Sequence, residues 1–168
     1  MEDYYPALIK AKENGLRVTC HFAEVPNEDE ANFVLEHPSF KPDRFGHSTC
    51  VHPKTGGFQG VWDKFCELGI PTEICLTSNA QCKSVVAFEE SHLIPFYEAG
   101  LPVCICTDDK GAFFTSSTEE HERAMDALKL SEDEMFELSM KSIDYTFAGE
   151  ETKNMLRSKF VEWKQKSS

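Results

Sequence analysis

The chain contains 168 residues, of which 17 are basic and 29 acidic, and its formal net charge at pH 7 is -12. This excess of negative charge disfavours nucleic acid and anionic membranes as partners, because both attract basic surfaces. A small phosphorylated ligand stays compatible with the composition, since one or two local cations suffice to bind it.

The amino-terminal residues 1–6 are acidic and lack the basic and apolar regions of a signal peptide. No apolar run approaches the ~20 residues needed to cross a bilayer. We therefore expect a cytosolic protein with no membrane partner. The seven cysteines include no C-x-x-C pair, a pattern that favours buried, reduced thiols over a structural zinc site.

Four short apolar runs alternate with segments that carry helix signals. The runs predict strands over residues 16–20, 43–46, 72–76 and 102–106. The intervening segments predict helices over residues 4–14, from 27 to 38, over 61–68 and ending at 97–100, with a loop over 48–60. The runs recur about every thirty residues, which fits one strand, one helix and two loops of a parallel βα unit.

Local signals set the boundaries of the first helices. Gly15 and Gly69 are typical helix stops. Asn27 with Glu30 three residues later resembles a capping box, which predicts a helix start. The apolar face of that helix is expected to use Ala31, Val34 and Leu35.

Beyond the fourth run the alternation ends, and three helices are expected. They start near Ser117, near Ser131 and after Gly149, and the first two starts are typical of capping boxes. Helical spacing predicts the core-facing stripes. The stripes are Phe136, Met140, Ile143 and Phe147 in the middle helix, and Leu156, Phe160 and Trp163 in the last.

Polar residues follow all four predicted strands. They are His21, His47, the triplet 77–79 (Thr-Ser-Asn) and the pair Asp108–Asp109. Carboxyl ends of parallel strands meet at one edge of a sheet, and reactive side chains collected there are typical of a (β/α) barrel active site. Four βα units are half of such a barrel, and a complete one needs about 200 residues or more. The sequence therefore predicts an α/β fold and half of an active site.

The adjacent carboxylates of Asp108 and Asp109 point to different sides of a strand end, so one can reach a metal while the other reaches a substrate. Two carboxylates this close repel each other, and a cation or a hydrogen-bonding partner stabilises the pair. The alternative is simple turn chemistry, because Asp-Asp-Lys-Gly is a reasonable turn.

His21 and Glu24 are three residues apart at the end of the first strand. The imidazole can bind a divalent metal, and the carboxyl group can donate a proton over the mouth of a barrel. Either could equally be part of an ordinary loop, and His47 is ambiguous in the same way. What favours function is their expected location at one end of one sheet.

Lys110 follows the aspartate pair, and its ammonium group can pair with Asp109 or approach a 5′-phosphate. The alternative is a solvated loop lysine. The other histidines fall in polar loops or at helix ends and are expected to be solvated. They are His37, His52, His92 and His121.

These motifs together resemble those of the adenosine/AMP deaminase family, metal-dependent hydrolases built on a (β/α) barrel. Residues 20–24 (Cys-His-Phe-Ala-Glu) resemble the family's H-A-G-E motif, with alanine in place of glycine. Residues 44–48 resemble R-I-G-H-G with two changes, and residues 73–79 match E-x-C-P-x-S-N. Residues 106–110 resemble S/N-T-D-D-P, with lysine in place of proline. The forms L-T-S-N and T-D-D-K-G-x-F are most similar to the adenosine deaminase-like branch, which deaminates N-methylated AMP.

The resemblance implies zinc-dependent deamination of a purine nucleoside or nucleotide. It implies that His21 and Asp108 are zinc ligands and that Glu24 protonates a purine ring nitrogen. His47 would orient, and could deprotonate, the water on zinc, and Asp109 would hydrogen-bond the purine. Zinc lowers the pKa of its bound water from ~15.7 toward ~7, and a carboxyl group in a dry pocket can stay protonated at neutral pH.

The family also takes two zinc ligands from an H-x-H motif on its first strand, and this sequence contains no H-x-H. Two protein ligands are fewer than the three or more that a stable catalytic zinc site needs. The expectation is therefore a partial domain over residues 1–168, the carboxyl-terminal half of a (β/α)8 TIM-type barrel with four parallel strands, flanking helices and further carboxyl-terminal helices. One Zn²⁺ is expected per complete barrel.

A half barrel leaves its edge strands open and its inner face uncovered, and we expect that face to be apolar. Weak zinc binding, little activity and self-association through the edges follow from this. One alternative is a non-catalytic fragment that acts as a binding or regulatory partner. Another is a different metal hydrolase that acts on amides or phosphoesters. The choice among adenosine, AMP and N-methyl-AMP stays open.

Overall fold

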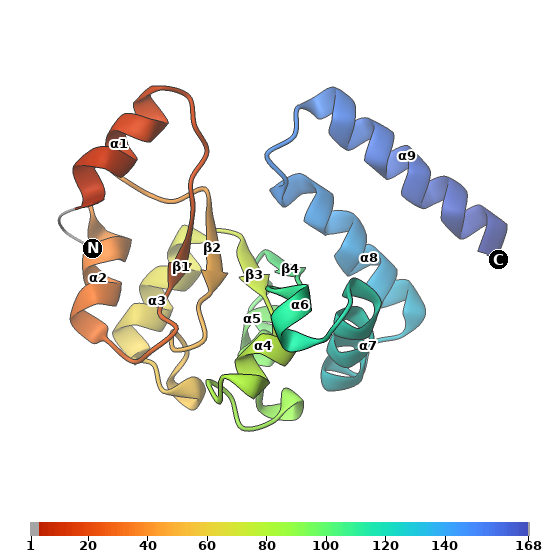
Figure 1. Cartoon of the computed structure of the whole chain (residues 1–168), viewed down its shortest axis with the longest axis horizontal. Coiled ribbons are helices and arrows are strands. Elements are labelled where there is room, and N and C mark those ends of the chain that lie inside the picture. Colours follow the sequence, from red (N-terminus) through yellow and green to blue (C-terminus); the bar gives the residue numbers. More distant parts are fainter. Residues whose placement is uncertain (1–3, 168) are drawn as a thin grey trace.

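The computed structural model describes residues 4–167 and contains one parallel sheet. Its strands are β1 (Thr19–Phe22), β2 (Arg44–His47), β3 (Thr72–Ile74) and β4 (Val103–Ile105). They lie side by side in chain order, β1-β2-β3-β4, with a helical connection after each strand (Figure 1). The prediction of four parallel βα units is confirmed. His21 and His47 lie within β1 and β2, however, and not just beyond them.

Helices connect the strands and continue after the last one. The α-helices are α1 (Tyr5–Glu13), α2 (Glu28–Glu36), α3 (Gln59–Leu68), α4 (Leu76–Gln81), α5 (Leu93–Glu98), α6 (Lys110–Phe113), α7 (Ser117–Leu128), α8 (Glu132–Ser142) and α9 (Glu150–Ser167). Short 3-10 helices are η2 (Pro53–Thr55), η3 (Phe88–Glu90) and η4 (Ile143–Tyr145). Among the described residues, no helix combines the length and apolar character needed to cross a bilayer.

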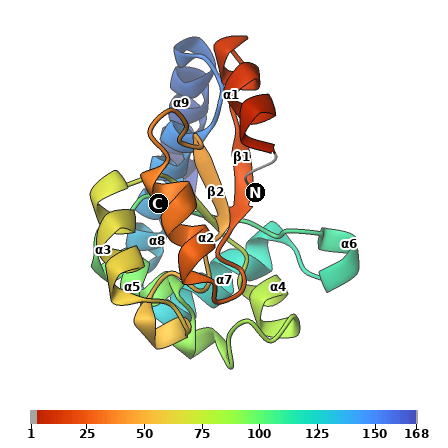
Figure 2. The same cartoon turned by 90° about the vertical axis from the view of Figure 1, so that its left-hand side faces the viewer.

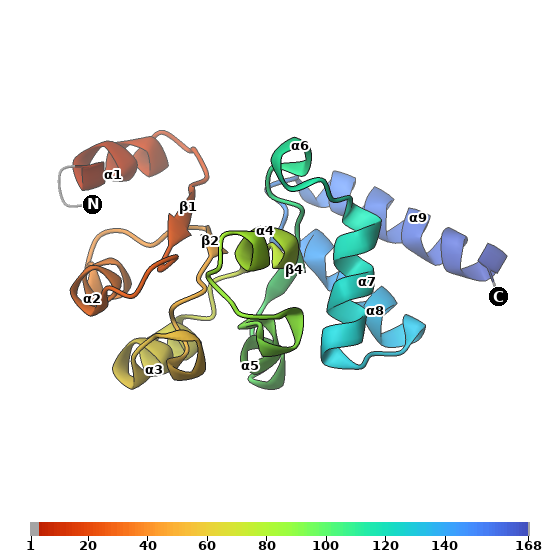
Figure 3. The same ribbon diagram turned by 60° about the horizontal axis from the view of Figure 1, so that its bottom comes forward.

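The apolar core lies between the sheet and an arc formed by α2, α3 and α5 (Figure 3). Aromatic rings form its centre, because Phe22 of β1 stacks on Phe45 of β2 with ring centroids 4.4 Å apart. Phe65 of α3 continues the stack, and Phe96 of α5 packs on Phe65 at 5.1 Å. These rings are almost fully buried, so this face of the sheet is fixed by burial of apolar surface.

The opposite face of the sheet is polar, which corrects the expectation of an apolar inner face. Residues paired in register on neighbouring parallel strands share a face. Thr19 pairs with Arg44, and a second row runs through His21, Gly46, Glu73 and Cys104. The short helix α6 projects on this side, away from α3 and α5 (Figure 2). Charged and hydroxyl groups therefore line the open side of the half barrel.

Helix starts follow the sequence signals closely. The side chain of Asn27 accepts a hydrogen bond from the Glu30 amide, and Ser131 and Glu134 form a full capping box. The helix near residue 117 is capped by Ser116, one residue earlier than expected, and Ser116 accepts from the Glu119 amide.

The stripe expected on α8 is wrong in part. Its most buried side chains are Met135 and Leu138, whereas Phe147 of the expected stripe is 43% exposed. Ile143 is buried as expected. Phe136 packs against α9. Its ring contacts the rings of Phe160 and Trp163, two residues of the stripe expected in the last helix.

All seven cysteines are free thiols. Cys50 and Cys75 are buried, and Cys82 is exposed. The other four are half-buried. The expectation of buried thiols is therefore correct for Cys50 and Cys75, partly correct for these four, and wrong for Cys82.

Candidate active site

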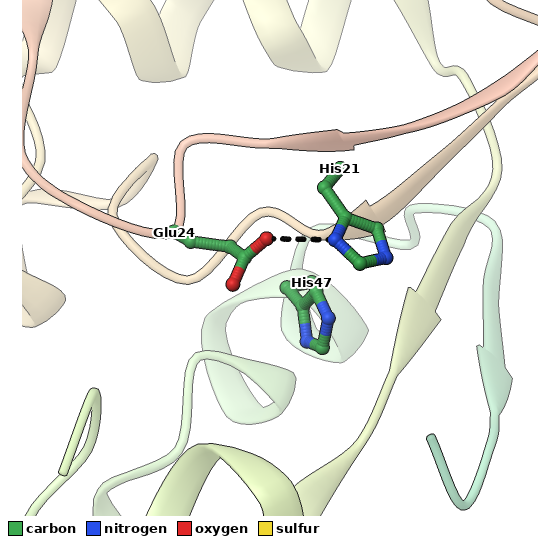
Figure 4. A group of neighbouring side chains, drawn as sticks. All are labelled: His21, Glu24 and His47. Atoms are coloured by element: carbon green, nitrogen blue, oxygen red, sulfur yellow. Dashed lines mark ion pairs between the residues drawn. The ribbon is translucent and has the colours of Figure 1, made fainter. Parts of the chain in front are cut away.

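The first polar pair, His21 and Glu24, lies at the carboxyl end of β1. Nδ1 of His21 is 3.0 Å from a carboxylate oxygen of Glu24 (Figure 4). The turn between them passes through Ala23, whose φ of 46° is in the left-handed region that non-glycine residues rarely adopt. That turn brings the carboxylate back toward the imidazole. Both side chains are open to solvent on the polar side of the sheet, at 68% and 45% exposure.

His21 lies over the neighbouring strand because that strand has a glycine at the contact point. A Cβ on Gly46 would be 2.7 Å from Cδ2 of His21. The rings of His21 and His47 then meet edge to face, with centroids 4.7 Å apart (Figure 4). Gly46 therefore permits the approach of the two histidines.

His47 is buried and is held from three directions. Its Nδ1 lies 3.2 Å from Nδ2 of Asn79, and its Nε2 lies 3.6 Å from a carboxylate oxygen of Asp108. Its backbone carbonyl oxygen lies 2.7 Å from Nε2 of His92. The φ of His47 is 60°, a strained conformation of the kind that clusters at functional sites.

His92 is the main correction among the histidines. It was expected to be solvated, but its side chain is completely buried. Burial lowers the pKa of His92 to about 4, so the ring is neutral near neutral pH. Sequence reasoning missed this residue because its partner lies 45 positions away in the chain.

The triplet at 77–79, which was expected to follow the third strand, lies in the first turns of the helix α4. This helix aims two of its side chains at the site. Ser78 donates a hydrogen bond of 2.7 Å to Asp108, and Asn79 contacts His47. Asp108 itself has a φ of 55°. Each of the three segments that supply site residues therefore contains a residue with left-handed backbone geometry: Ala23, His47 and Asp108.

Metal-binding side chains gather around His47. Within the described residues, two groups of three place their ligand atoms within 4.8 Å of one another. One group is His21, Glu24 and His47, and the other is His47, Cys75 and Asp108. Burial raises the pKa of the Cys75 thiol well above its usual value, which makes it a weak ligand at neutral pH. Imidazole and carboxylate donors suit Zn²⁺ in kind, but the predicted pair His21 and Asp108 supplies only two of the three or more that it needs.

Asp109 and Lys110 are exposed at the start of α6. Among the described residues, their side chains form no ion pair with each other and no hydrogen bond to the His47 cluster. The structure therefore brings together His21, Glu24, His47 and Asp108. Asp109 and Lys110 follow Asp108 directly in the chain, after β4.

A cavity of about 180 Å³ borders the site between the end of β1 and α2. His21 and Glu24 line one side of it, and Ala31 and Val34 of α2 line the other. Pockets for drug-sized ligands typically measure about 300–1,000 Å³. The cavity in the described residues is therefore smaller than a typical pocket for a drug-sized ligand.

Comparison with known proteins identifies the family to which this site belongs. A sequence model of the adenosine deaminase family, described as "Adenosine deaminase", matches residues 1–163. The chain belongs to the adenosine deaminase family. This confirms the resemblance inferred from the four motifs.

Two relatives are N6-methyl-AMP deaminases. The zebrafish (Danio rerio) protein is 41% identical over 165 residues, which are 98% of this chain and 47% of the relative. The human (Homo sapiens) protein is 35% identical over 159 residues, 95% of this chain and 44% of the relative. The chain therefore spans less than half the length of these relatives.

Solved structures agree with the partial barrel. The chain matches an Arabidopsis ADAL structure complexed with IMP at a TM-score of 0.85 and 41% identity, covering 95% of this chain and 44% of the other. An Arthrobacter aurescens adenine deaminase has the same fold at 23% identity and a TM-score of 0.79. The four βα units thus form part of a (β/α) barrel of this family.

Proposed function

We propose that the chain contributes its four βα units to a barrel that hydrolytically deaminates a purine nucleotide, with N6-methyl-AMP as the preferred substrate. The observation that carries the proposal is the convergence of His21, Glu24 and Asp108 around the buried His47. Two further findings support the choice of substrate. The zebrafish and human relatives are named N6-methyl-AMP deaminases, and Arabidopsis ADAL has been solved with IMP and with GMP.

In the proposed reaction, water adds to the amine-bearing carbon of the purine and the bond from that carbon to nitrogen then breaks. The amine leaves with a proton, and the purine becomes a carbonyl compound. Glu24 would donate a proton to the ring nitrogen, which makes the neighbouring carbon more electrophilic. Its carboxyl group follows the carboxyl end of β1 and is 45% exposed, so a heterocycle could approach it.

His47 would orient the attacking water and accept its proton. Its burial and its contact with Asn79 fix the ring, so Nε2 faces Asp108. The bond from Ser78 fixes Asp108 in turn. A general base works only when it is held within hydrogen-bonding reach of the proton it removes, and these contacts restrict both groups to one geometry.

His21 and Asp108 would hold a zinc ion, with the remaining ligands supplied from outside residues 1–168. When bound, zinc would lower the pKa of water from ~15.7 toward ~7. Asp109 would hydrogen-bond the purine, and Lys110 would approach the 5′-phosphate. Both side chains are exposed beside the cluster and are free to reach a ligand.

The rest of the barrel would have to come from other βα units. The open sheet order and the length of the relatives support a partial domain over residues 1–168, with one zinc per complete barrel. The polar inner face supports the same idea, because its charged side chains suit a barrel interior that surrounds a polar site. The proposed preference for N6-methyl-AMP over AMP and adenosine is a property of the complete barrel and not of residues 1–168 alone.

The test is a chimera in which residues 1–168 replace the matching segment of the zebrafish relative. Turnover of N6-methyl-AMP, AMP and adenosine would be followed by absorbance, and zinc content by elemental analysis. Glu24→Gln and Asp108→Asn should each lower turnover about 100-fold or more, because each removes a group that acts on the reacting atoms. Glu122→Gln and Asp126→Asn, two exposed positions on α7, are matched controls.

Each outcome bears on a separate part of the proposal. A folded chimera that deaminates no purine would overturn it and favour a non-catalytic role. Activity that survives Asp108→Asn without loss of zinc would overturn the ligand assignment alone. Zinc-dependent activity of the purified 168-residue chain as a monomer would overturn the partial-barrel reading.

A further inference from the structure

Glu120 is completely buried on α7. Its carboxyl group accepts hydrogen bonds from the Thr77 backbone amide at 3.1 Å and from Oγ1 of Thr115 at 2.7 Å. It also contacts the hydroxyl of Thr77, and Nη1 of Arg123 lies 3.2 Å away. A buried carboxyl group is costly unless it is fully paired, and this one has partners on every side.

Two of these partners lie in the segments that follow β3 and β4. Thr77 is in the first turn of α4, the helix that follows β3, and Thr115 ends the segment that follows β4. Cys75, the residue before α4, makes no side-chain cap to that helix. Glu120 takes the place of the missing cap by accepting from the buried amide of Thr77, which has no partner within the first turn of α4. It thereby ties both segments to α7.

The helix α4 carries the two side chains that hold the site in place. Ser78, next to Thr77, donates to Asp108, and Asn79 contacts Nδ1 of His47. A rotation of α4 about its axis would therefore move both contacts at once. Its orientation depends on the bonds to Glu120, because a helix of 6 residues has little stability of its own.

We propose that Glu120 is a positioning residue that sets the orientation of His47 and Asp108 through Thr77 and α4. The proposal rests on the function proposed above. Glu120 touches neither the substrate nor the reacting atoms, and it acts only through the hydrogen bonds that fix α4.

A purely structural role would give a different result. If Glu120 only stabilised the fold, its loss would lower the melting temperature and leave the site of the folded protein unchanged. If it positions α4, the folded variant should have an altered environment at His47 and a slower chemical step. The two roles are separated by measurements made well below the melting temperature.

The main variant is Glu120→Gln, which keeps the size of the side chain but replaces one acceptor oxygen by a donor. Glu122→Gln is the matched control, because it makes the same change on the same helix at an exposed position. Thr77→Val is the second test variant. It removes the hydroxyl bond to Glu120 with little change in volume and leaves the backbone amide intact.

Two readouts are needed. In the 168-residue chain labelled with 15N-histidine, the ring nitrogen shifts of His47 report the contacts with Asn79 and Asp108, and His37 and His52 serve as internal references. In the chimera, kcat and KM for N6-methyl-AMP are measured. We expect Glu120→Gln to move the His47 signals and to lower kcat by about 10–100-fold, the range typical of residues that orient the ligands of a metal site. KM should change less than about 3-fold, since no substrate contact is lost.

The proposal is overturned if folded Glu120→Gln matches Glu122→Gln in both readouts. If Glu120→Gln does not fold, Thr77→Val decides: unchanged His47 signals and kcat in that variant overturn the proposal, and altered ones support it. A folded but inactive wild-type chimera counts against the proposed function only. In that case the His47 signals of the two test variants alone decide whether Glu120 positions the site.

Discussion

Nε2 of the buried His92 lies 2.7 Å from the backbone carbonyl oxygen of His47, so one histidine fixes the backbone of another. The carbonyl belongs to a residue with a φ of 60°, at the end of β2. A donor at this point stabilises a conformation that the backbone would otherwise disfavour. This contact is therefore part of what holds His47 in the site.

The stability of the chain should fall in acid because of His92. Burial lowers the pKa of His92 from the ordinary value of 6.5 to about 4. The hydrogen bond to the His47 carbonyl raises this pKa, and the charge of His47 lowers it further, but burial is the largest cause. The unfolded chain therefore binds a proton below pH 6.5 that the folded chain does not bind until about pH 4. The free energy of unfolding should decrease by about 3 kcal/mol as the pH falls through this window.

Urea unfolding at several pH values would measure this effect. His92→Gln keeps a donor for the His47 carbonyl but cannot titrate, so its stability should depend less on pH between 6.5 and 4. His121→Gln on α7 is the matched control and should keep the wild-type pH dependence. Parallel curves for wild type and His92→Gln across this window would contradict the prediction.

Gly46→Ala should displace His21 while the fold is kept. The new Cβ would be 2.7 Å from Cδ2 of His21, and this exposed side chain can rotate away. Its contacts with Glu24 and His47 would be lost, so zinc affinity of the chimera should fall about 10-fold or more. Gly60→Ala is the control, because a Cβ there meets nothing within 4 Å. Equal zinc affinity in both variants would show that the clash with His21 does not affect zinc binding.

The sequence predicted the elements whose signals are local. The alternation of apolar runs with helix stops and caps identified all four strands, and Asn27 and Ser131 cap the helices they were expected to start. The carboxyl edge of a parallel sheet then brought His21, His47 and Asp108 together. Periodicity and capping depend on a few neighbouring residues, which is why a single sequence is enough to find them.

The parts that the sequence did not predict depend on distant contacts. The buried His92 is paired with a carbonyl 45 residues away, and the buried Glu120 with Thr77, 43 residues away. One local signal for Glu120 was present, because Ala124 follows it by one helical turn on the buried face of α7. A carboxylate on such a face indicates a buried polar contact but does not identify its partner.

Arg44 should stabilise the attachment of the carboxyl-terminal helices. Its guanidinium donates to Glu73 at 2.5 Å and to the Tyr145 carbonyl at 2.8 Å, and it lies over the Phe147 ring. Arg44→Met should lower the free energy of unfolding by about 2 kcal/mol, between the values for exposed and for fully buried pairs. Arg44→Lys should recover only part of this, because an ammonium lacks the planar fork.

Urea unfolding would measure both variants, with Arg17→Met as the control. Arg17 forms an ion pair with Asp43, but its side chain is 66% exposed, so its loss should change stability by less than about 1 kcal/mol. Amide exchange in α8 and α9 should become faster in Arg44→Met only. A stability of Arg44→Met equal to that of Arg17→Met would show that the contacts with η4 and Phe147 contribute nothing.

Lys110→Met should separate nucleotides from nucleosides. The ammonium of Lys110 is exposed beside Asp109 at the start of α6, and within the described chain it has no ion-pair partner to hold it. If it approaches the 5′-phosphate, its removal should raise KM of the chimera for N6-methyl-AMP about 10-fold, since a charge-assisted contact contributes about 1.5–3 kcal/mol. Turnover of the matching nucleoside, which has no phosphate, should not change. Lys159→Met on α9 removes the same charge far along the chain and should affect neither substrate. An equal loss for nucleotide and nucleoside would rule out a phosphate contact.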